Sequence, residues 1–379
     1  MSRMKRRLFR APRLALGSLA VAIAAAVCGC RTIGYYAQAV RGECQIVARQ
    51  QRIEKVLADP QTPDVLKARL QLVQQLRAFA AKELKLPVDG HYLRYADLHR
   101  EFVVWNVYAA PEFSLEPKTW WYPFVGSLDY RGYFAESAAR NYAAGIAKKG
   151  FDVHVEGVEA YSTLGWLKDP VLNTFINHSD AGLAEIIFHE LGHQRVFAHG
   201  DTDFNEAFAT VVGEEGARRW LRAKGDTAAL EQYQAALRRN AQFVRLVADA
   251  RQKLEALYGD ERMSGGEIKA AKKPRSVAPE ALRQEKQRIL DGLRRDYGAL
   301  EATWRKSTAD DVWLTSSANN AQLNSVATYF DLVPAFERLL AANGGDLEKY
   351  YAAAERLTKL PRAERHRELR GKEDRPSRP

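Results

Sequence analysis

The sequence predicts an α+β fold that is predominantly α-helical, with a small sheet beside a central helix and extra helical hairpins. Helical patterns dominate residues 46–81 and most of the chain after residue 181. Residues 102–134 are instead rich in Val, Trp, Tyr and Phe, which is strand composition. The central helix is marked by Ala184-Glu185-Ile186-Ile187-Phe188, an apolar, helix-forming run that leads into a cluster of His and Glu residues.

The first thirty residues have the features of a targeting segment. Six basic residues accompany an apolar run over residues 14–27, which is short for a membrane span. The run ends in Val27-Cys28-Gly29-Cys30, which resembles a bacterial lipoprotein signal. The resemblance implies a signal peptide over residues 1–29 and a lipid on Cys30. Because Arg31 follows, it also implies an outer-membrane anchor on a periplasm-facing envelope protein. An ordinary secretory signal or an uncleaved anchor is the alternative.

Composition limits the partners of the processed chain. The full chain carries 57 basic and 47 acidic residues, a net charge of +10. Without the six basic residues of the targeting segment, 51 basic residues remain against 47 acidic ones, a net charge of +4. This near balance argues against nucleic-acid binding. Only Cys44 would remain as a thiol, so the fold is not built on internal disulfides.

Local patterns predict the elements before the central helix. Residues 46–81 form a helical hairpin interrupted by Asp59-Pro60 and Thr62-Pro63. Residues 102–134 supply strands, residues 135–149 form a helix ended by Gly150, and residues 151–158 alternate as a strand does.

The second half is expected to be helical. The central helix spans about residues 181–198 with Asp180 as its N-cap, and a second helix runs from about Asn205 to Ala223. Residues 226–310 are mostly charged and predict solvated helical hairpins. Residues 319–340 form a more apolar helical region. The tail, residues 361–379, is charged and Pro-bearing and is expected to be disordered.

The central helix carries His189-Glu190-Leu191-Gly192-His193, a metalloprotease signature. Residues i and i+4 lie on the same helical face, so His189 and His193 can bind one metal ion. Glu190 points beside that ion, where a carboxylate can accept a proton from water activated by zinc. The motif therefore predicts half of a catalytic zinc site together with its general base.

A catalytic zinc site usually takes three protein ligands, and two residues compete for the third position. His199 lies ten residues after His189, but that arrangement needs a Gly where this chain has Val196. Glu206 opens the next helix in apolar surroundings, where an unpaired carboxylate would be costly. We expect Glu206 to complete a His2Glu set.

Further segments resemble a known family. They are residues 34–42, 130–134, 160–166, 188–194 and 204–209, with Asn319-Asn320-Ala321 and Tyr329 near the end. Over roughly residues 30–360, the chain closely resembles the bacterial putative-aminopeptidase lipoproteins, a zincin-like group. The resemblance implies a zincin-like core in a single peptidase domain over residues 30–360, with helical insertions at about 226–310. It also implies hydrolysis of peptide or protein substrates with one Zn²⁺, held by the Glu of Asn205-Glu206 as third ligand.

Other site residues are expected around the metal. Tyr329, or alternatively His178, would stabilise the oxyanion. Tyr161, Ser162 and Thr163 would form an edge strand that pairs with substrate backbone. The residues expected to line the cleft are Tyr130, Arg131 and Tyr133. An acidic residue would bind the amino group of a substrate, and the sequence does not select among Glu159, Glu214 and Glu215.

Alternatives to an aminopeptidase stay open at this point. The site could serve a zinc endopeptidase. A non-catalytic envelope lipoprotein could use the metal structurally, with His199 as fourth ligand, but such a site would not need Glu190. A helical scaffold without metal is the third alternative.

Overall fold

The computed structural model describes residues 32–123, 126–160, 167–263, 268–270, 277–304 and 318–371. The chain divides into two compact units, one ending at Arg49 and one over Gln50–Pro379. In the first unit, residues 32–49 form a helix. None of the helices in the described part of the chain is long and apolar enough to cross a membrane. Cys30 and the expected signal peptide lie outside the described residues.

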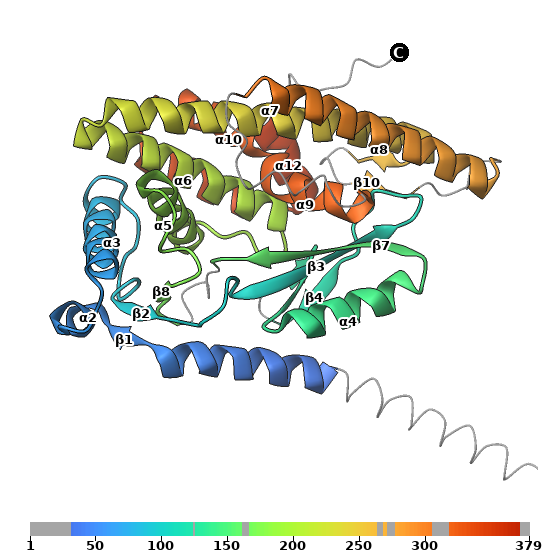
Figure 1. Ribbon diagram of the computed structural model, residues 1–379. Helices are drawn as coiled ribbons and strands as arrows, with labels where there is room; N and C mark the ends of the chain where they lie inside the picture. Colours follow the sequence, from blue (N-terminus) through green and yellow to red (C-terminus); the bar gives the residue numbers. More distant parts are fainter. Residues whose placement is uncertain are drawn as a thin grey trace, which may run out of the picture. The chain divides into compact units, whose positions relative to one another are not determined.

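The second unit mixes small sheets with many helices, which confirms the predicted α+β, mostly helical class (Figure 1). Its earlier helices are α2 (Ile53–Ala58), α3 (Asp64–Lys82), α4 (Glu136–Ala147), α5 (Asp180–Arg195) and α6 (Thr202–Lys224). Its later helices are α7 (Thr227–Tyr258), α8 (Pro279–Ala302), α9 (Asn320–Phe330), α10 (Val333–Ala342), α11 (Leu347–Thr358) and α12 (Arg362–Arg370).

The strands form four small sheets. Three strands make the order β6-β3-β7, with β3 (Val104–Pro111), β6 (Arg131–Tyr133) and β7 (Phe151–Val158). Another three make β1-β2-β8, with β1 (Gln51–Arg52), β2 (Arg94–Ala96) and β8 (Val171–Leu172). The remaining pairs are β4 (Trp120–Tyr122) with β5 (Gly126–Leu128) and β9 (Glu261–Arg262) with β10 (Ile268–Lys269).

The β6-β3-β7 sheet is covered by a helix on each face (Figure 1). On one face, Ala109 and Val153 pack with Ile146 of α4. Helix α9 contacts β3 and β7 on the opposite face, where Asn319 donates to the carbonyl of Val153 at 3.0 Å. The predicted strand over residues 151–158 matches β7, and the helix expected over 135–149 matches α4, followed by Gly150 at φ +83°.

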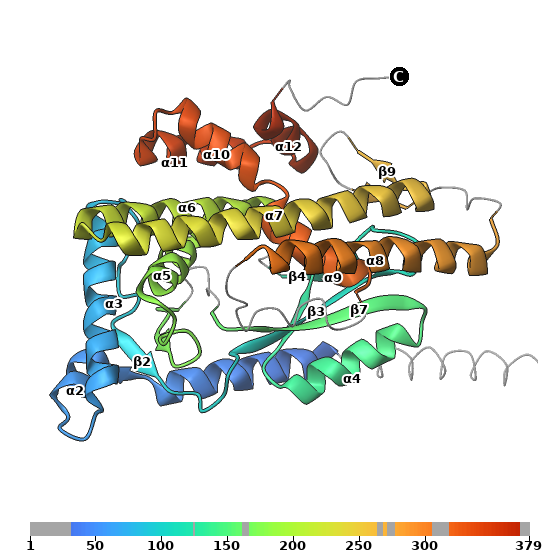
Figure 2. The same cartoon turned by 45° about the horizontal axis from the view of Figure 1, so that its top comes forward.

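The charged helices α7 and α8 run side by side (Figures 1 and 2). They were expected to be solvated, but each has a buried stripe. Leu254 of α7 and Leu290 of α8 join Leu323 of α9 and Leu115 in one core. The apolar residues of these two helices are sparse but recur on one face. This face packs against α9.

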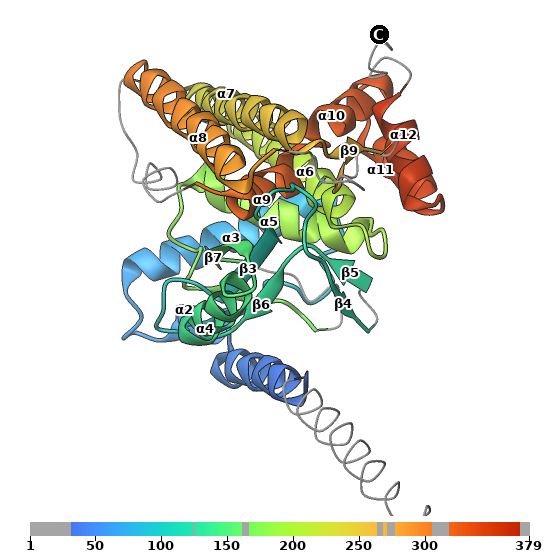
Figure 3. The ribbon, with the colours of Figure 1, turned by 90° about the vertical axis from the view of Figure 1, so that its right-hand side faces the viewer.

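The end of the chain differs from its prediction. Residues 362–370 form α12, which lies with α10 and α11 in one group (Figures 2 and 3). Arg365 is only 5% exposed and His366 only 3% exposed. The expectation of disorder from residue 361 is therefore wrong for this segment, because charged side chains are buried here against a partner of opposite charge. Residues 372–379 lie outside the described residues.

Candidate metal centre

Helix α5 presents the His-Glu motif from a buried position. Ser179 caps the helix by accepting the backbone N–H of Gly182 at 3.1 Å, and Asp180, the expected cap, is the first helical residue. Val196 ends the helix in an extended conformation, so the turn does not use the special backbone that a Gly would allow. Leu183, Ile187 and Leu191 are fully buried, and this apolar packing fixes the helix.

Helix α6 begins directly after a short connection from α5. Asp201 caps it by accepting the N–H of Phe204 at 3.4 Å. The side chain of Asn205 brackets Ala198: its Oδ1 accepts the Ala198 N–H at 2.7 Å, and its Nδ2 donates to the Ala198 carbonyl at 2.8 Å. These bonds tie the first turn of α6 to the connection, and Glu206 is the next residue.

Small residues let α5 and α6 approach closely. A Cβ on Gly213 would lie 2.8 Å from the carbonyl oxygen of Glu185 and 3.1 Å from the Cβ of His189. A Cβ on Gly192 would lie 3.3 Å from the Cα of Ala209. The two helices therefore pack backbone to backbone, which brings Glu206 to the histidine face of α5.

His189, His193 and Glu206 converge with their ligand atoms within 4.8 Å of one another. The Nε2 atoms of the two histidines are 3.2 Å apart. Oε2 of Glu206 lies 3.4 Å from Nε2 of His189 and 3.5 Å from Nε2 of His193. His199 is exposed and does not join this group.

These distances fit a tetrahedral zinc ion. Zinc bonds of 2.0–2.1 Å place two ligand atoms of a tetrahedron about 3.3 to 3.4 Å apart. The three observed separations lie within about 0.2 Å of that range. The donor set, two imidazole nitrogens and one carboxylate oxygen, is also one that zinc accepts.

Electrostatics within the triad favours a cation. Burial acts to raise the pKa of Glu206, but the two imidazoles outweigh it and lower this pKa to about 2. Burial lowers the pKa of His189, whereas for His193 the carboxylate of Glu206 outweighs burial and raises the pKa. The triad thus keeps its carboxylate ionised and stabilises positive charge beside it.

Glu190 lies on the same helix and is 8% exposed. Its Oε2 atom is buried without a hydrogen-bond partner among the described residues. Burial, with smaller effects from other groups, raises the pKa of Glu190 to about 8. A raised pKa makes the ionised carboxylate a stronger base than an ordinary Glu, and a general base needs this strength to take a proton from water.

Sequence patterns missed Tyr92 and Asp169, which lie near Glu190. Burial raises the pKa of Tyr92 far above its ordinary value, and the carboxylates of Glu190 and Asp169 add to the shift. Tyr92 is 2% exposed and has φ +56°, a rare conformation for a bulky residue. Asp169 pairs with His91 at 3.2 Å. No motif marks these residues, because they come from loops distant in sequence.

The two candidates for the oxyanion role differ in their environment. Burial raises the pKa of Tyr329 far above its ordinary value, and the charges of nearby groups, Glu206 among them, add to the shift, so the hydroxyl keeps its proton. His178 is instead 2.6 Å from Glu159 in a half-exposed pair. The environment therefore favours Tyr329 over His178.

The residues predicted to line the cleft or to pair with substrate differ in position. The ring of Tyr130 lies 5.8 Å from that of Tyr108, on the α9 side of the sheet. Arg131 donates to Tyr133 at 3.0 Å and lies over Tyr142 of α4 on the other side, so packing explains this pair. Tyr161, Ser162 and Thr163 lie outside the described residues, and the edge-strand prediction stays a prediction.

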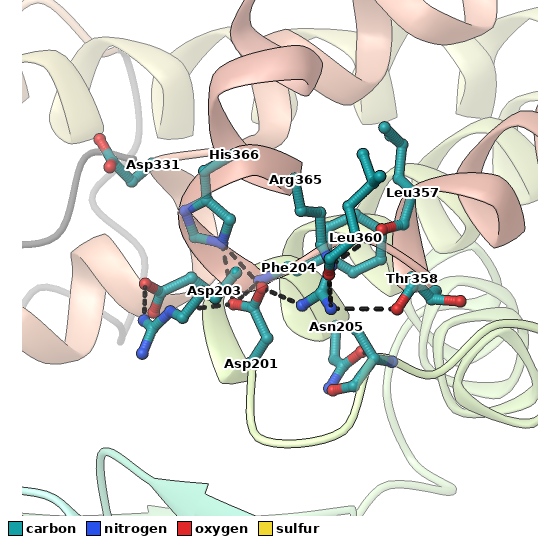
Figure 4. Close-up of polar contacts among 12 residues, drawn as sticks. Asp201, Asp203, Phe204, Asn205, Asp331, Leu357, Thr358, Leu360, Arg365 and His366 are labelled. Carbon is teal, nitrogen blue, oxygen red and sulfur yellow. Dashed lines mark hydrogen bonds and ion pairs between the residues drawn. The ribbon is translucent and has the colours of Figure 1, made fainter. Parts of the chain in front are cut away.

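A buried charge cluster supports the start of α6 (Figure 4). Asp201 has a fully buried side chain and pairs with Arg365 of α12 at 2.5 Å. Its carboxylate is also 2.9 Å from Nε2 of His366. Arg365 donates further to the carbonyls of Leu357, Thr358 and Leu360, so α12 is held in place from several sides.

A comparison with known protein families gives a match over most of the chain. A family model described as "Putative aminopeptidase" matches residues 34–369. The chain belongs to this family. The match includes α5, α6 and most of α12, and the family's description supports peptide hydrolysis as the general activity. Searches of curated proteins and of solved structures gave no match.

Proposed function

We propose that this protein is a zinc-dependent peptidase with a zincin-like core. The observation that carries the proposal is the triad of His189, His193 and Glu206, with Glu190 beside it on the same helix. The three residues would hold one zinc ion. When bound, the ion supplies Lewis acidity toward water and toward a peptide carbonyl.

The chain's own residues supply the proton transfers and the orientation. Glu190 accepts a proton from the attacking water and returns it to the leaving amine. Its burial at 8% exposure keeps the carboxyl group away from bulk water. The Tyr329 hydroxyl, which keeps its proton, donates a hydrogen bond to the oxygen on which negative charge develops.

A purely structural metal is less compatible with these residues. A closed structural zinc site takes four protein ligands, whereas the cluster among the described residues offers three. His199, the expected fourth ligand of that alternative, is exposed and packs near the backbone of Gly126. Three ligands leave a position for water, as catalytic sites require.

The test compares wild type with Glu190→Gln. Both proteins, purified as residues 31–379 and loaded with zinc, are assayed for bound metal and for cleavage of a peptide panel. We expect equal zinc content and a loss of about 10²- to 10⁴-fold in cleavage rate for the variant. Cleavage by neither protein, or equal cleavage by both, would contradict the proposal.

For the location, we propose a lipid-anchored protein of the bacterial envelope that faces the periplasm, in the outer membrane. The support is the sequence around Cys30 and the Arg31 that follows it. Labelling of cells with a radioactive fatty acid should mark the protein, and Cys30→Ala should lose the label. Labelling retained in Cys30→Ala would contradict the anchor.

A further inference from the structure

One face of the β6-β3-β7 sheet carries polar side chains. In the antiparallel register of β3 and β7, Asn106 faces Glu156 and Tyr108 faces His154. Directly paired residues, and residues two apart on one strand, point to the same side of a sheet. These four side chains therefore share one face. The alternate residues, such as Ala109 and Val153, face α4 instead.

This polar face lies under α9, which contacts β3 and β7 and also packs against α6, the helix that carries Glu206. The carboxylates of Glu156 and Glu206 both contribute, after burial, to the raised pKa of Tyr108. The same two carboxylates contribute to the raised pKa of Tyr329 on α9. Two hydroxyl groups thus lie within electrostatic reach of both the triad and Glu156.

Two polar atoms of this face lack a hydrogen-bond partner among the described residues. The Tyr108 hydroxyl, on a side chain 1% exposed, and Nε2 of His154 are buried without one. Glu156 takes part in no hydrogen bond or ion pair in the part of the chain that the structure describes, and burial raises the pKa of its carboxyl group to about 7. Buried polar groups without partners cost stability, and their retention points to a ligand that pairs with them.

The acidic residues expected to bind a substrate amine are already paired. Glu159 lies 2.6 Å from His178. Glu214 pairs with Arg218 at 2.8 Å, and Glu215 pairs with Arg219 at 2.9 Å. Each of these carboxylates would have to give up an existing partner to accept an ammonium group, whereas Glu156 has none among the described residues.

On the basis of the proposed peptidase function, we propose that Glu156 binds the free α-ammonium group of a peptide substrate, which makes the enzyme an aminopeptidase. In an amino-terminal residue, only the Cα atom separates the ammonium group from the scissile carbonyl. An anchor for the ammonium must therefore lie on the same side of the site as the carbonyl, and Glu156 lies on the sheet face that α9 connects to α6. The substrate class is peptides with an unblocked amino terminus.

Binding tests this role independently of turnover. Zinc-loaded Glu190→Gln protein is titrated by calorimetry with tripeptides and with their N-acetylated counterparts, with and without the additional change Glu156→Gln. Free tripeptides should bind about 10- to 100-fold more tightly than acetylated ones, and Glu156→Gln should abolish this preference. The exchange is isosteric, and thermal denaturation with zinc content verifies that the double variant folds.

Glu159→Gln in the same background is the matched control, three residues away on a paired carboxylate. The Glu159→Gln protein should still bind free tripeptides more tightly than N-acetylated ones. Any of the following binding results would overturn the assignment: equal binding of free and acetylated peptides, a preference that survives Glu156→Gln, a preference lost only in Glu159→Gln, or no binding at all. Failure of the peptidase proposal is separate, since it shows as missing zinc or as no cleavage by wild type. Equal cleavage of free and acetylated peptides would retain the peptidase and remove the role of Glu156.

Discussion

Asp201 at the start of α6 and Arg365 in α12 form a buried ion pair of 2.5 Å across 164 residues of sequence (Figure 4). The pair joins the last helix of the described chain to the cap of the helix that carries Glu206. A helix cap and a distant charged segment thus cooperate to position one side of the candidate metal centre.

Replacement of Arg365 by Ala should destabilise the protein. Asp201 would keep His366 but lose its closest cationic partner in a fully buried position, at a cost on the order of 3 kcal/mol. Urea denaturation measures the change in the free energy of unfolding. Arg367→Ala, an exposed change on the same helix, is the control and should leave the unfolding curve in place. Equal stability of Arg365→Ala and wild type would contradict the role of the pair.

Gly213→Ala should separate α5 from α6. The added methyl group would meet the Glu185 carbonyl at 2.8 Å, so we expect a loss of about 1–3 kcal/mol and weaker zinc binding. Gly145→Ala in α4 is the control, since nothing lies within 4 Å of the added Cβ, and helix propensity should stabilise it slightly. Unchanged zinc affinity in Gly213→Ala would show that the close approach does not position the triad.

Tyr329→Phe should lower kcat by about 10²- to 10³-fold if the hydroxyl stabilises the oxyanion. Zinc content and KM should change little, because the ring remains. Tyr142→Phe, on the α4 side of the sheet, serves as control and should retain kcat. A full kcat in Tyr329→Phe, with a loss in His178→Gln instead, would assign the role to His178.

The stability of the protein should depend on pH through Glu156. Burial raises its pKa to about 7 in the folded state, from an ordinary value of 4.5. The folded state then binds the proton more tightly, so stability is greatest below about pH 4.5 for this group and falls as pH rises to about 7. Glu156→Gln removes this loss and should be more stable than wild type at pH 8, on the order of 2 kcal/mol, with a smaller difference at pH 5. Denaturation at both pH values measures it, and an equal difference at the two would contradict the raised pKa.

Local patterns predicted much of this site. His189 and His193 are four residues apart on one helix, so their convergence follows from helix geometry alone. Glu206 follows after a short connection. It was chosen as the third residue because a carboxylate without a partner is costly in apolar surroundings. The alternation of residues 151–158 likewise gave the bounds of β7.

Residues brought together by long-range pairing could not be predicted in the same way. The proximity of Tyr108 to His154 depends on the register of two strands separated by α4. Composition predicted disorder near Arg365 because charge usually marks solvated chain, but here the charge is neutralised by Asp201. The polar residues at alternate positions, Asn106 with Tyr108 and His154 with Glu156, were a usable signal for a functional sheet face.

Zinc binding by wild type and Glu206→Gln, measured by metal content and by competition with a chelator, tests the triad most directly. Wild type should bind one zinc ion per chain, and Glu206→Gln should bind it at least about 100-fold more weakly. Glu215→Gln, on the same helix but paired with Arg219, should bind zinc as wild type does. Zinc bound equally by wild type and Glu206→Gln, or by neither, would contradict a metal centre formed by His189, His193 and Glu206.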